Sequence, residues 1–171
     1  MTRLLAPILA FTSQEIWAAM PHAAGDDEAC VLFNDIPDYR SELALSDEEL
    51  YRWGVLVSLR DAVNKALENA RAAGVFKKAQ DTELTISVAE EKDADFLAGA
   101  DLATLCIVSK VTVTTQAIEG ERAEDCLMPC TIAVKPSQAP KCPRCWNHDE
   151  HIGASGHHME LCDRCAAVLG E

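Results

Sequence analysis

The stretch Lys141 to Gly170 contains two cysteine pairs, Cys142-Pro143-Arg144-Cys145-Trp146 and Cys162-Asp163-Arg164-Cys165-Ala166. Each pair has the spacing C-x-x-C, and sixteen residues separate the two pairs. A loop of this length places two sulfurs at a suitable distance around one tetrahedral ion. The pattern therefore predicts one zinc ion held by four thiolates, those of Cys142, Cys145, Cys162 and Cys165. Because four protein ligands leave no open position for water or substrate, the ion is expected to be structural and not catalytic.

The segment that carries these cysteines is too short to bury a stable core by itself. Its apolar residues are few: Trp146, Ile152, Met159, Leu161, Val168 and Leu169. Zinc binding in such sites contributes on the order of 10–16 kcal/mol near neutral pH, and only as the segment folds. We therefore expect a zinc ribbon that collapses when a chelator removes the ion.

Two other interpretations of the four cysteines remain open. A pair of disulfide bonds would need an oxidising compartment. A thioredoxin-like redox pair would need a strand and a helix beside it, which the neighbouring sequence does not suggest. A histidine between the pairs could also replace a thiolate, although four cysteines already complete the site; the candidates are His148, His151, His157 and His158.

The composition of the chain describes an acidic globular protein with a basic segment. The 171 residues are 49% apolar, which is enough for one or two small domains with a core. The net charge of −13 argues against a nucleic-acid partner, because Lys and Arg drive phosphate binding. Residues 51–80, however, contain six basic and two acidic residues, a local charge of +4, and the rest of the chain carries −17. One face of the protein can therefore be basic.

The apolar run from Leu4 to Phe11 looks superficially like a secretory signal. Pro7 interrupts this run, and Thr12-Ser13-Gln14-Glu15 predicts a capping box at the start of a helix instead. Without a signal the cysteines stay reduced, so a cytoplasmic location is expected. No stretch approaches the roughly eighteen apolar residues of a membrane span, and no membrane partner is expected.

The first half of the chain has helical periodicity. Residues 2–9 read as the last turns of a helix whose beginning is missing, and residues 13–20 as a second helix. A Pro-interrupted connection follows, with Val31-Leu32-Phe33 as its only apolar anchor. Ser46-Asp47-Glu48-Glu49 predicts a capping box for a long helix over 47–72. The apolar residues of that helix are expected to face a bundle core: Leu50, Trp53, Leu56, Val57, Val63, Leu67 and Ala70.

The periodicity then changes to that of a small α/β module. Strands are predicted over 82–89, 105–114 and 131–135, with a helix over 93–103. The remaining cysteines are interpreted as structural or incidental: Cys30, Cys106, Cys126 and Cys130.

The predicted fold class is α+β. A partial helical bundle over 1–74 is followed by a small α/β connector with a short sheet over 75–138 and a four-cysteine zinc ribbon over 139–171. The chain shows no glycine-rich nucleotide loop, phosphate loop or nucleophile elbow. We therefore expect no catalytic residue in it.

Three groups of residues together resemble the C-terminal region of bacterial isoleucyl-tRNA synthetases: Leu4-Leu5-Ala6-Pro7-Ile8-Leu9-Ala10-Phe11-Thr12 with Glu15-Ile16-Trp17, Arg60-Asp61-Ala62-Val63-Asn64-Lys65-Ala66-Leu67-Glu68, and Lys141 to Trp146 with Leu161 to Cys165. The resemblance covers essentially the whole chain, and the ribbon is its most specific part. One departure is Phe76-Lys77-Lys78-Ala79-Gln80-Asp81, where family members commonly carry Gly-x-Ser-Leu-Glu-Ala.

This resemblance implies a parent enzyme that uses ATP to join isoleucine to its tRNA. The catalytic and editing domains, and with them the ATP site, would precede Met1, so the fragment alone is expected to be inactive and monomeric. Its partners would be those missing domains and the anticodon stem and loop of the isoleucine-specific tRNA. The candidate tRNA-binding residues are Lys141, Arg144, Trp146, Arg164, Arg71, Lys77 and Lys78.

Two features favour RNA contact by the ribbon. Arg144 and Arg164 occupy equivalent positions in the two loops, and Trp146 offers a stacking surface for an unpaired base. Alternatively, the arginines offset the charge of the thiolates and Trp146 packs inside the ribbon. Two other functions stay open: the tail of a DNA-repair glycosylase, which ends in a similar ribbon, and a scaffold module that docks on its own enzyme without touching RNA.

Overall fold

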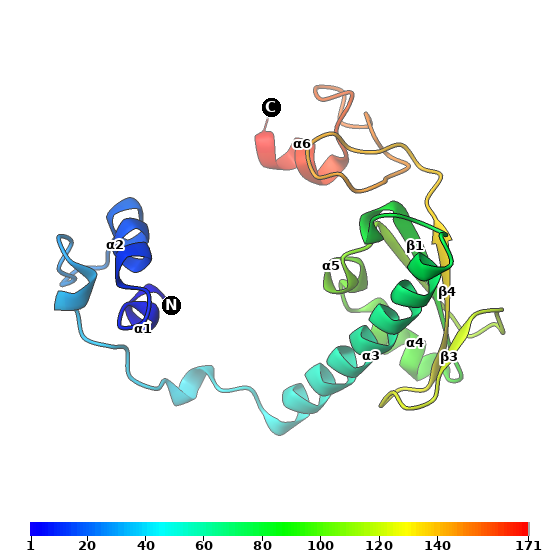
Figure 1. Cartoon of the computed structure of the whole chain (residues 1–171), viewed down its shortest axis with the longest axis horizontal. Coiled ribbons are helices and arrows are strands. Elements are labelled where there is room, and N and C mark those ends of the chain that lie inside the picture. Colours follow the sequence, from blue (N-terminus) through cyan, green and yellow to red (C-terminus); the bar gives the residue numbers. More distant parts are fainter. Residues whose placement is uncertain (171) are drawn as a thin grey trace. The chain divides into compact units, whose positions relative to one another are not determined.

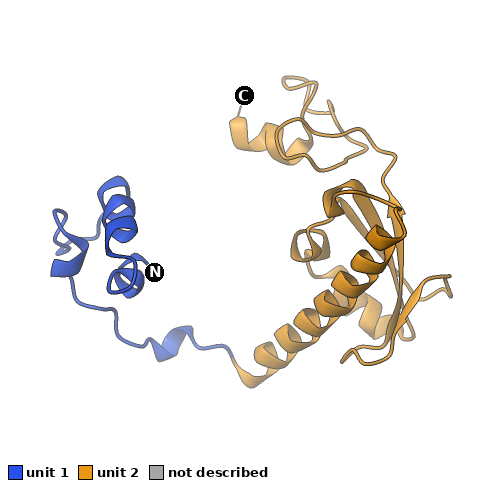
Figure 2. Ribbon diagram, in the orientation of Figure 1, with its two compact units in different colours: residues 1–45 blue, residues 46–171 orange. Residues whose placement is uncertain are grey.

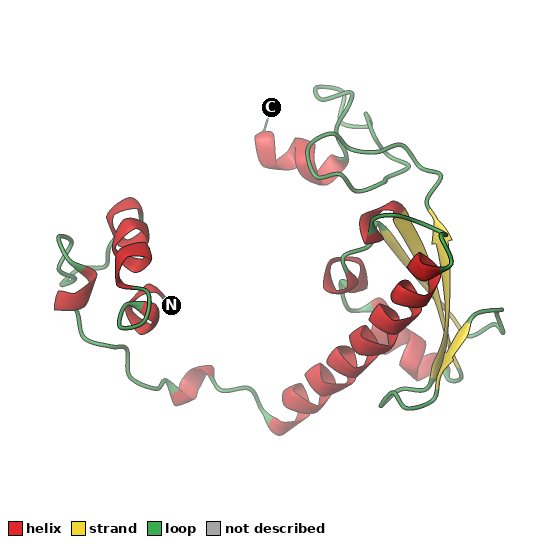
Figure 3. Ribbon diagram, in the orientation of Figure 1, coloured by secondary structure: helices red, strands yellow, loops and turns green. Residues whose placement is uncertain are grey.

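The computed structural model describes residues 1–170, which form an α+β fold of short helices, one long helix and one sheet (Figure 3). The chain divides into two compact units, Met1–Leu45 and Ser46–Glu171 (Figure 2). No helix in the described part of the chain combines the length and the apolar character that a membrane crossing requires.

The first unit is organised around Trp17. It contains α1 (Thr2–Leu5), α2 (Ala10–Ala19) and two 3-10 turns, η1 (Val31–Phe33) and η2 (Ser41–Leu43). Trp17 packs with Ala6 and Val31 in a small buried cluster, and its indole Nε1 donates to the Asp27 carbonyl at 2.9 Å. Of the predicted apolar anchor Val31-Leu32-Phe33, Val31 is buried as expected, whereas Leu32 and Phe33 are exposed, so that part of the prediction is wrong.

The start of α2 differs from the prediction. This helix begins at Ala10, with Leu9 at its N-cap and no side-chain cap, so the capping box at Thr12 is wrong. The polar side chain of Gln14 acts in the tertiary structure instead. It donates to the Ala29 carbonyl and accepts from the Val31 N–H, both at 2.9 Å, and so ties the connecting segment to the helix.

The long helix α3 (Asp47–Ala72) has the predicted bounds. The Ser46 N–H donates to Glu49 Oε2 at 2.8 Å, and the Glu49 N–H donates to Ser46 Oγ at 3.3 Å. These reciprocal bonds confirm the capping box, which satisfies donors that the first turn leaves free. After the helix Gly74 has φ +76°, the left-handed conformation that glycine adopts without strain.

The buried face of α3 packs on the α/β module. Its buried residues are Val55, Leu59, Val63, Ala66 and Leu67. Val63 and Leu67 were predicted to be buried, but Leu50, Trp53 and Val57 are about half exposed, so that part of the prediction is wrong. The helix carries two apolar stripes, and the sheet covers only the one that contains Leu59 and Val63.

The sheet has four strands in the order β2-β1-β4-β3. β1 (Thr82–Val88) pairs in parallel with β2 (Lys110–Thr114) and antiparallel with β4 (Cys130–Pro136), which pairs antiparallel with β3 (Glu121–Ala123). The crossover from β1 to β2 contains α4 (Glu91–Ala98) and α5 (Leu102–Cys106). These two helices and α3 lie over one face of the sheet (Figure 1), so β1 alternates between buried and half-buried residues.

The crossover shows two further differences from the predicted elements. The helix expected over 93–103 is two helices, because Asp101 begins a new one by accepting from the Thr104 N–H at 3.1 Å. Ile107, at φ +57°, ends α5, so β2 starts at Lys110 and not at Leu105. The predicted strands near β1 and β4 are confirmed. The short β3 was not predicted. Cys106, Cys126 and Cys130 all lie in the core beneath the sheet.

Candidate metal centre and nucleic-acid interface

The first cysteine pair lies in a tight loop. The Cys142 N–H donates to the Asn147 carbonyl at 2.9 Å, and the Trp146 N–H donates to the Cys142 carbonyl at 2.8 Å. A single β-bridge between Lys141 and His148 closes the base of the loop. Trp146 follows the second cysteine at φ +66°, a turn that directs the chain back toward the bridge.

The second pair stands at the start of α6 (Asp163–Leu169). Cys162 is the N-cap residue of this helix, and its carbonyl accepts from the Ala166 N–H at 2.9 Å. The loop before it is closed by the Gly153 N–H, which donates to the Leu161 carbonyl at 3.0 Å. Gly153 has φ +85°, and a Cβ there would lie 2.6 Å from the Met159 carbonyl oxygen, so only glycine fits without a shift.

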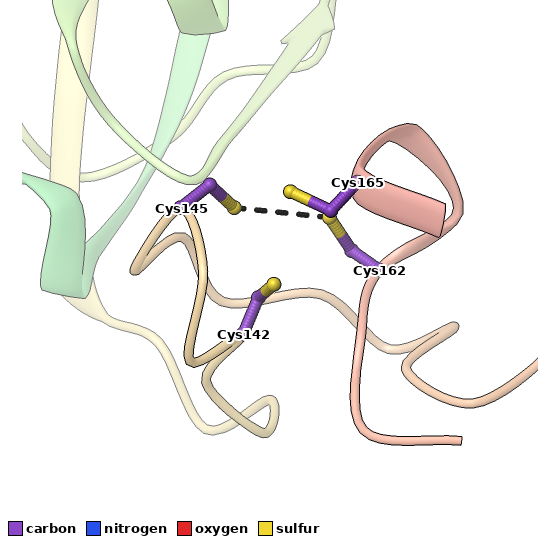
Figure 4. A group of neighbouring side chains, drawn as sticks. All are labelled: Cys142, Cys145, Cys162 and Cys165. Carbon is purple, nitrogen blue, oxygen red and sulfur yellow. Dashed lines mark hydrogen bonds between the residues drawn. The ribbon is translucent and has the colours of Figure 1, made fainter. Parts of the chain in front are cut away.

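The four sulfurs converge on one point between the two loops (Figure 4). All of them lie within 4.8 Å of one another, and Cys145 Sγ is 3.7 Å from Cys162 Sγ. A tetrahedral zinc ion with Zn–S bonds of about 2.3 Å separates its ligands by about 3.8 Å. A disulfide would need an S–S distance of about 2.05 Å. The spacing therefore fits four ligands of one ion.

The backbone around Cys142 favours a thiolate. Burial raises the pKa of this thiol, but the N–H groups of Cys145, Cys162 and Arg144 point at the sulfur and lower its pKa to about 6. Burial raises the pKa of Cys162 to about 12. Four thiols in one buried place cannot all ionise without a cation. A bound metal ion resolves this conflict, because its ligands bind as thiolates.

The two equivalent arginines have different surroundings. Arg164 bonds to the Cys145 sulfur, and this bond together with the negative charge of the cysteines raises the pKa of its guanidinium. It also lines a cleft of about 380 Å³ that contains Asp101, Thr104 and His148. Both arginines are exposed, but Arg144 does not line that cleft. The charge-offsetting interpretation is thus supported for Arg164.

The structure brings together two of the predicted tRNA-binding residues from distant parts of the sequence. Lys78 Nζ lies 5.8 Å from the centroid of the Trp146 ring, and Trp146 is 59% exposed. The indole therefore does not pack inside the ribbon. Lys77 is exposed beside Lys78, and Arg71 lies farther back on α3, with its guanidinium 5.4 Å from the Phe76 ring centroid.

Lys141 is placed differently from the other candidates. Its Nζ forms an ion pair of 2.5 Å with Asp81 Oδ1, at the junction of ribbon and module. Sequence reasoning missed Asp81, which has no motif of its own. It lies in the one stretch where this chain departs from the resemblance noted above.

Two family models match the chain. Residues 1–86 match the anticodon-binding domain of tRNA ligase, and residues 140–168 match the zinc finger found in FPG and IleRS. The four-cysteine cluster lies inside the second match and is consistent with one zinc ion. The zinc finger occurs in two groups of proteins, and the match over the first 86 residues favours the tRNA ligases.

Curated relatives give the same result. The chain is 36% identical to an isoleucine–tRNA ligase of Staphylococcus epidermidis over 99% of its length, 38% identical to that of Staphylococcus carnosus over 100%, and 36% identical to that of Coxiella burnetii over 96%. It spans 18% of the length of each of these relatives. An anticodon-binding domain implies tRNA binding. The chain belongs to the family of anticodon-binding domains of tRNA ligases, and it corresponds to the C-terminal, zinc-finger-bearing region of isoleucine–tRNA ligases.

Proposed function

We propose that this chain holds the anticodon stem and loop of the isoleucine-specific tRNA for an isoleucine–tRNA ligase. One structural zinc ion, bound by Cys142, Cys145, Cys162 and Cys165, would order the ribbon that presents the RNA-binding residues. The observation that carries the proposal is the exposed indole of Trp146 beside the ammonium group of Lys78.

This pair has the chemistry that a single-stranded nucleotide requires. An exposed aromatic ring stacks on an unpaired base, worth roughly 1–3 kcal/mol per base. A lysine beside the ring attracts the phosphate and releases a counterion from it. Arg144 and Lys77 are also exposed and extend the same chemistry along the ribbon and the loop that precedes β1.

The acidic character of the remaining chain is compatible with this role. The net charge is −13, so most of the surface repels a polyanion. RNA would then bind only where basic side chains lie close together, as Lys77 and Lys78 do. In the proposed organisation, residues 1–74 form the anticodon-binding part, 75–138 the α/β connector and 139–171 the ribbon.

Isoleucine activation with ATP and its transfer to tRNA would belong to parts of the ligase outside this chain. We therefore expect the isolated chain to bind tRNA as a monomer without charging it. A cytoplasmic location follows from the same proposal, since translation takes place there.

Binding of the isoleucine tRNA transcript by the zinc-loaded chain tests the proposal. Trp146→Ala should weaken binding by about 5- to 150-fold, the cost of one stacked base. Arg144→Ala should weaken binding and lower the slope of log affinity against log salt by about one. Arg122→Ala serves as the matched control, because this exposed arginine lies on β3 and pairs with Glu124.

Three results would argue against the proposal. No binding by the unaltered chain would refute tRNA recognition by this region. A preference for duplex DNA would favour the glycosylase alternative. Footprints on the anticodon loop that are identical with and without the ribbon would favour a scaffold role for the ribbon.

A further inference from the structure

The carboxylate of Asp81 joins the ribbon to the α/β module, where a second ion pair links Lys110 on β2 to Glu150 of the ribbon at 3.1 Å. Asp81 Oδ1 accepts from Lys141 Nζ at 2.5 Å and lies 3.3 Å from His148 Nε2. Lys141 and His148 are the two residues of the β-bridge at the base of the first cysteine loop. Asp81 therefore contacts both ends of the loop that carries Cys142, Cys145 and Trp146.

The backbone of Asp81 is tied to the other half of the predicted RNA surface. Its N–H donates to the Lys78 carbonyl at 2.9 Å within the 3-10 turn η3 (Ala79–Asp81). The side chain of Lys78 then reaches the Trp146 ring. One residue thus connects the loop that positions the ammonium group with the loop that positions the indole.

Neighbouring hydrogen bonds reinforce the same junction. The His148 N–H donates to Ser109 Oγ at 2.7 Å, and Ser109 Oγ donates to the Gln80 carbonyl. Gln80 Nε2 donates to Asn147 Oδ1 at 3.4 Å. The bonds of His148 and Asn147 join the first cysteine loop to the residues that precede β2 and β1, and the bond between Ser109 and Gln80 ties those two residues to each other.

The ion pair itself adds little to global stability. The side chains of Lys141 and Asp81 are 37% and 30% exposed, and ion pairs in such positions contribute about 0–1 kcal/mol. The bond to Lys141 lowers the pKa of the Asp81 carboxyl, with a smaller opposing effect of burial, so the group is ionised at neutral pH. The ion pair between Lys141 and Asp81 therefore matters for the position of the first cysteine loop and not for global stability.

We propose that Asp81 is a positioning residue that aligns Lys78 with Trp146, so that the two together bind one unpaired RNA nucleotide, its base on the indole and its phosphate at the ammonium group. This inference rests on the proposed function. It also assigns Lys141 to the junction and not to a phosphate contact, because the ammonium group of Lys141 is already paired with the carboxylate of Asp81. Asp81 itself touches no RNA.

The test compares two substitutions that remove the same charge, Asp81→Ala and Asp95→Ala, in the full zinc-loaded chain. Asp95 is an exposed carboxylate on α4. Loss of a negative charge alone leaves binding of a polyanion unchanged or tightens it. The positioning role predicts the opposite sign for Asp81→Ala: at least about fivefold weaker binding of isoleucine tRNA, the lower end of the cost of one stacked base. Asp81→Asn keeps the shape of the side chain and should fall between wild type and Asp81→Ala.

A double-mutant cycle supplies the second readout. If Asp81 acts by aligning Lys78 with Trp146, Asp81→Ala should have almost no further effect on affinity in a Trp146→Ala background. Zinc content should stay at one ion per chain in every variant.

Three outcomes would overturn the inference. Affinity of Asp81→Ala equal to or above that of Asp95→Ala would exclude a positioning role. Additive effects in the cycle would show that Asp81 does not act through Trp146. Loss of zinc from Asp81→Ala would place its action at the metal centre instead. If the unaltered chain failed to bind tRNA, the proposed function would fall as well, whereas the first three outcomes leave that function intact.

Discussion

Removal of zinc is expected to unfold the ribbon while the α/β module stays folded. The perturbation is a strong chelator added to the reduced, zinc-loaded chain at neutral pH. The two parts differ in what holds them together. The module has an extended core that includes Leu59, Leu84 and Ile132, whereas the ribbon core consists mainly of the four cysteines.

The magnitude follows from that difference. Apart from the cysteines, the ribbon core contains only Leu161 and Ile152 among the described residues. Because Ile152 is only partly buried, the two side chains contribute at most about 3–6 kcal/mol in total, since full burial is worth about 1.5–3 kcal/mol each. Zinc binding supplies on the order of 10–16 kcal/mol. Most of the stability of the ribbon is therefore expected to disappear with the ion, while the core between the sheet and α3 stays packed.

Titration of the eight cysteine thiols provides the assay, because the structure places them in three classes. Cys30 is half-buried and should react first in the zinc-loaded chain. The four thiols of the metal centre should react only after chelation. Cys106, Cys126 and Cys130 are buried in the module and should react only in denaturant. Burial raises the pKa of Cys106 and of Cys130 to about 11, which slows their reaction further.

The expected sequence of reacting thiols is thus one, four and three. Release of all seven remaining thiols by the chelator would show that the module also depends on the metal. No change on chelation, or fewer than eight thiols after denaturation of material purified without reductant, would refute the four-thiolate assignment. Circular dichroism serves as the control, since the signal of α3 should persist after chelation.

Three other perturbations test the fold. Leu59→Ala should destabilise the second unit by about 2–5 kcal/mol in urea unfolding, because this side chain is 0% exposed, while Leu50→Ala on the exposed stripe should change stability by less than about 0.5 kcal/mol. Ser46→Ala should cost about 0.5–2 kcal/mol by removing the N-cap, also seen in urea unfolding. The bonds from Thr104 lower the pKa of the Asp101 carboxyl. The ionised carboxylate therefore stabilises the folded state above the ordinary carboxyl range, and this stabilisation disappears as pH falls below about 4. Asp101→Asn keeps an acceptor oxygen for the cap but removes the charge. Its melting temperature should therefore lie below that of the wild type at neutral pH and approach it in acid, and a difference that does not change with pH would contradict a contribution from the ionised carboxylate.

Local sequence was sufficient for features whose cause lies within a few residues. The spacing of Cys142, Cys145, Cys162 and Cys165 predicted the cluster, because one short loop fixes two sulfurs. Ser46 and Glu49 predicted the start of α3, since the two groups bond each other across one turn. The alternation in β1 predicted a strand with one covered face.

The tertiary structure decided every feature that depends on distant partners. A helix with two apolar stripes does not specify which one is buried, and the sheet chose Leu59 and Val63 over Leu50 and Trp53. The three-residue β3 exists only because β4 pairs with it.

The same holds for the predicted RNA-binding residues. Arg144 and Arg164 are equivalent in sequence, yet the structure places Arg164 beside the Cys145 sulfur and in the cleft with Asp101, which Arg144 does not line. Lys78 and Trp146 are 68 positions apart in the chain and meet where the contacts of Asp81, Ser109 and Gln80 join the cysteine loop to the module. Residue type and spacing thus determined the metal centre and the element types, whereas the pairing of charges and rings across the junction arose from packing, which no local pattern encodes.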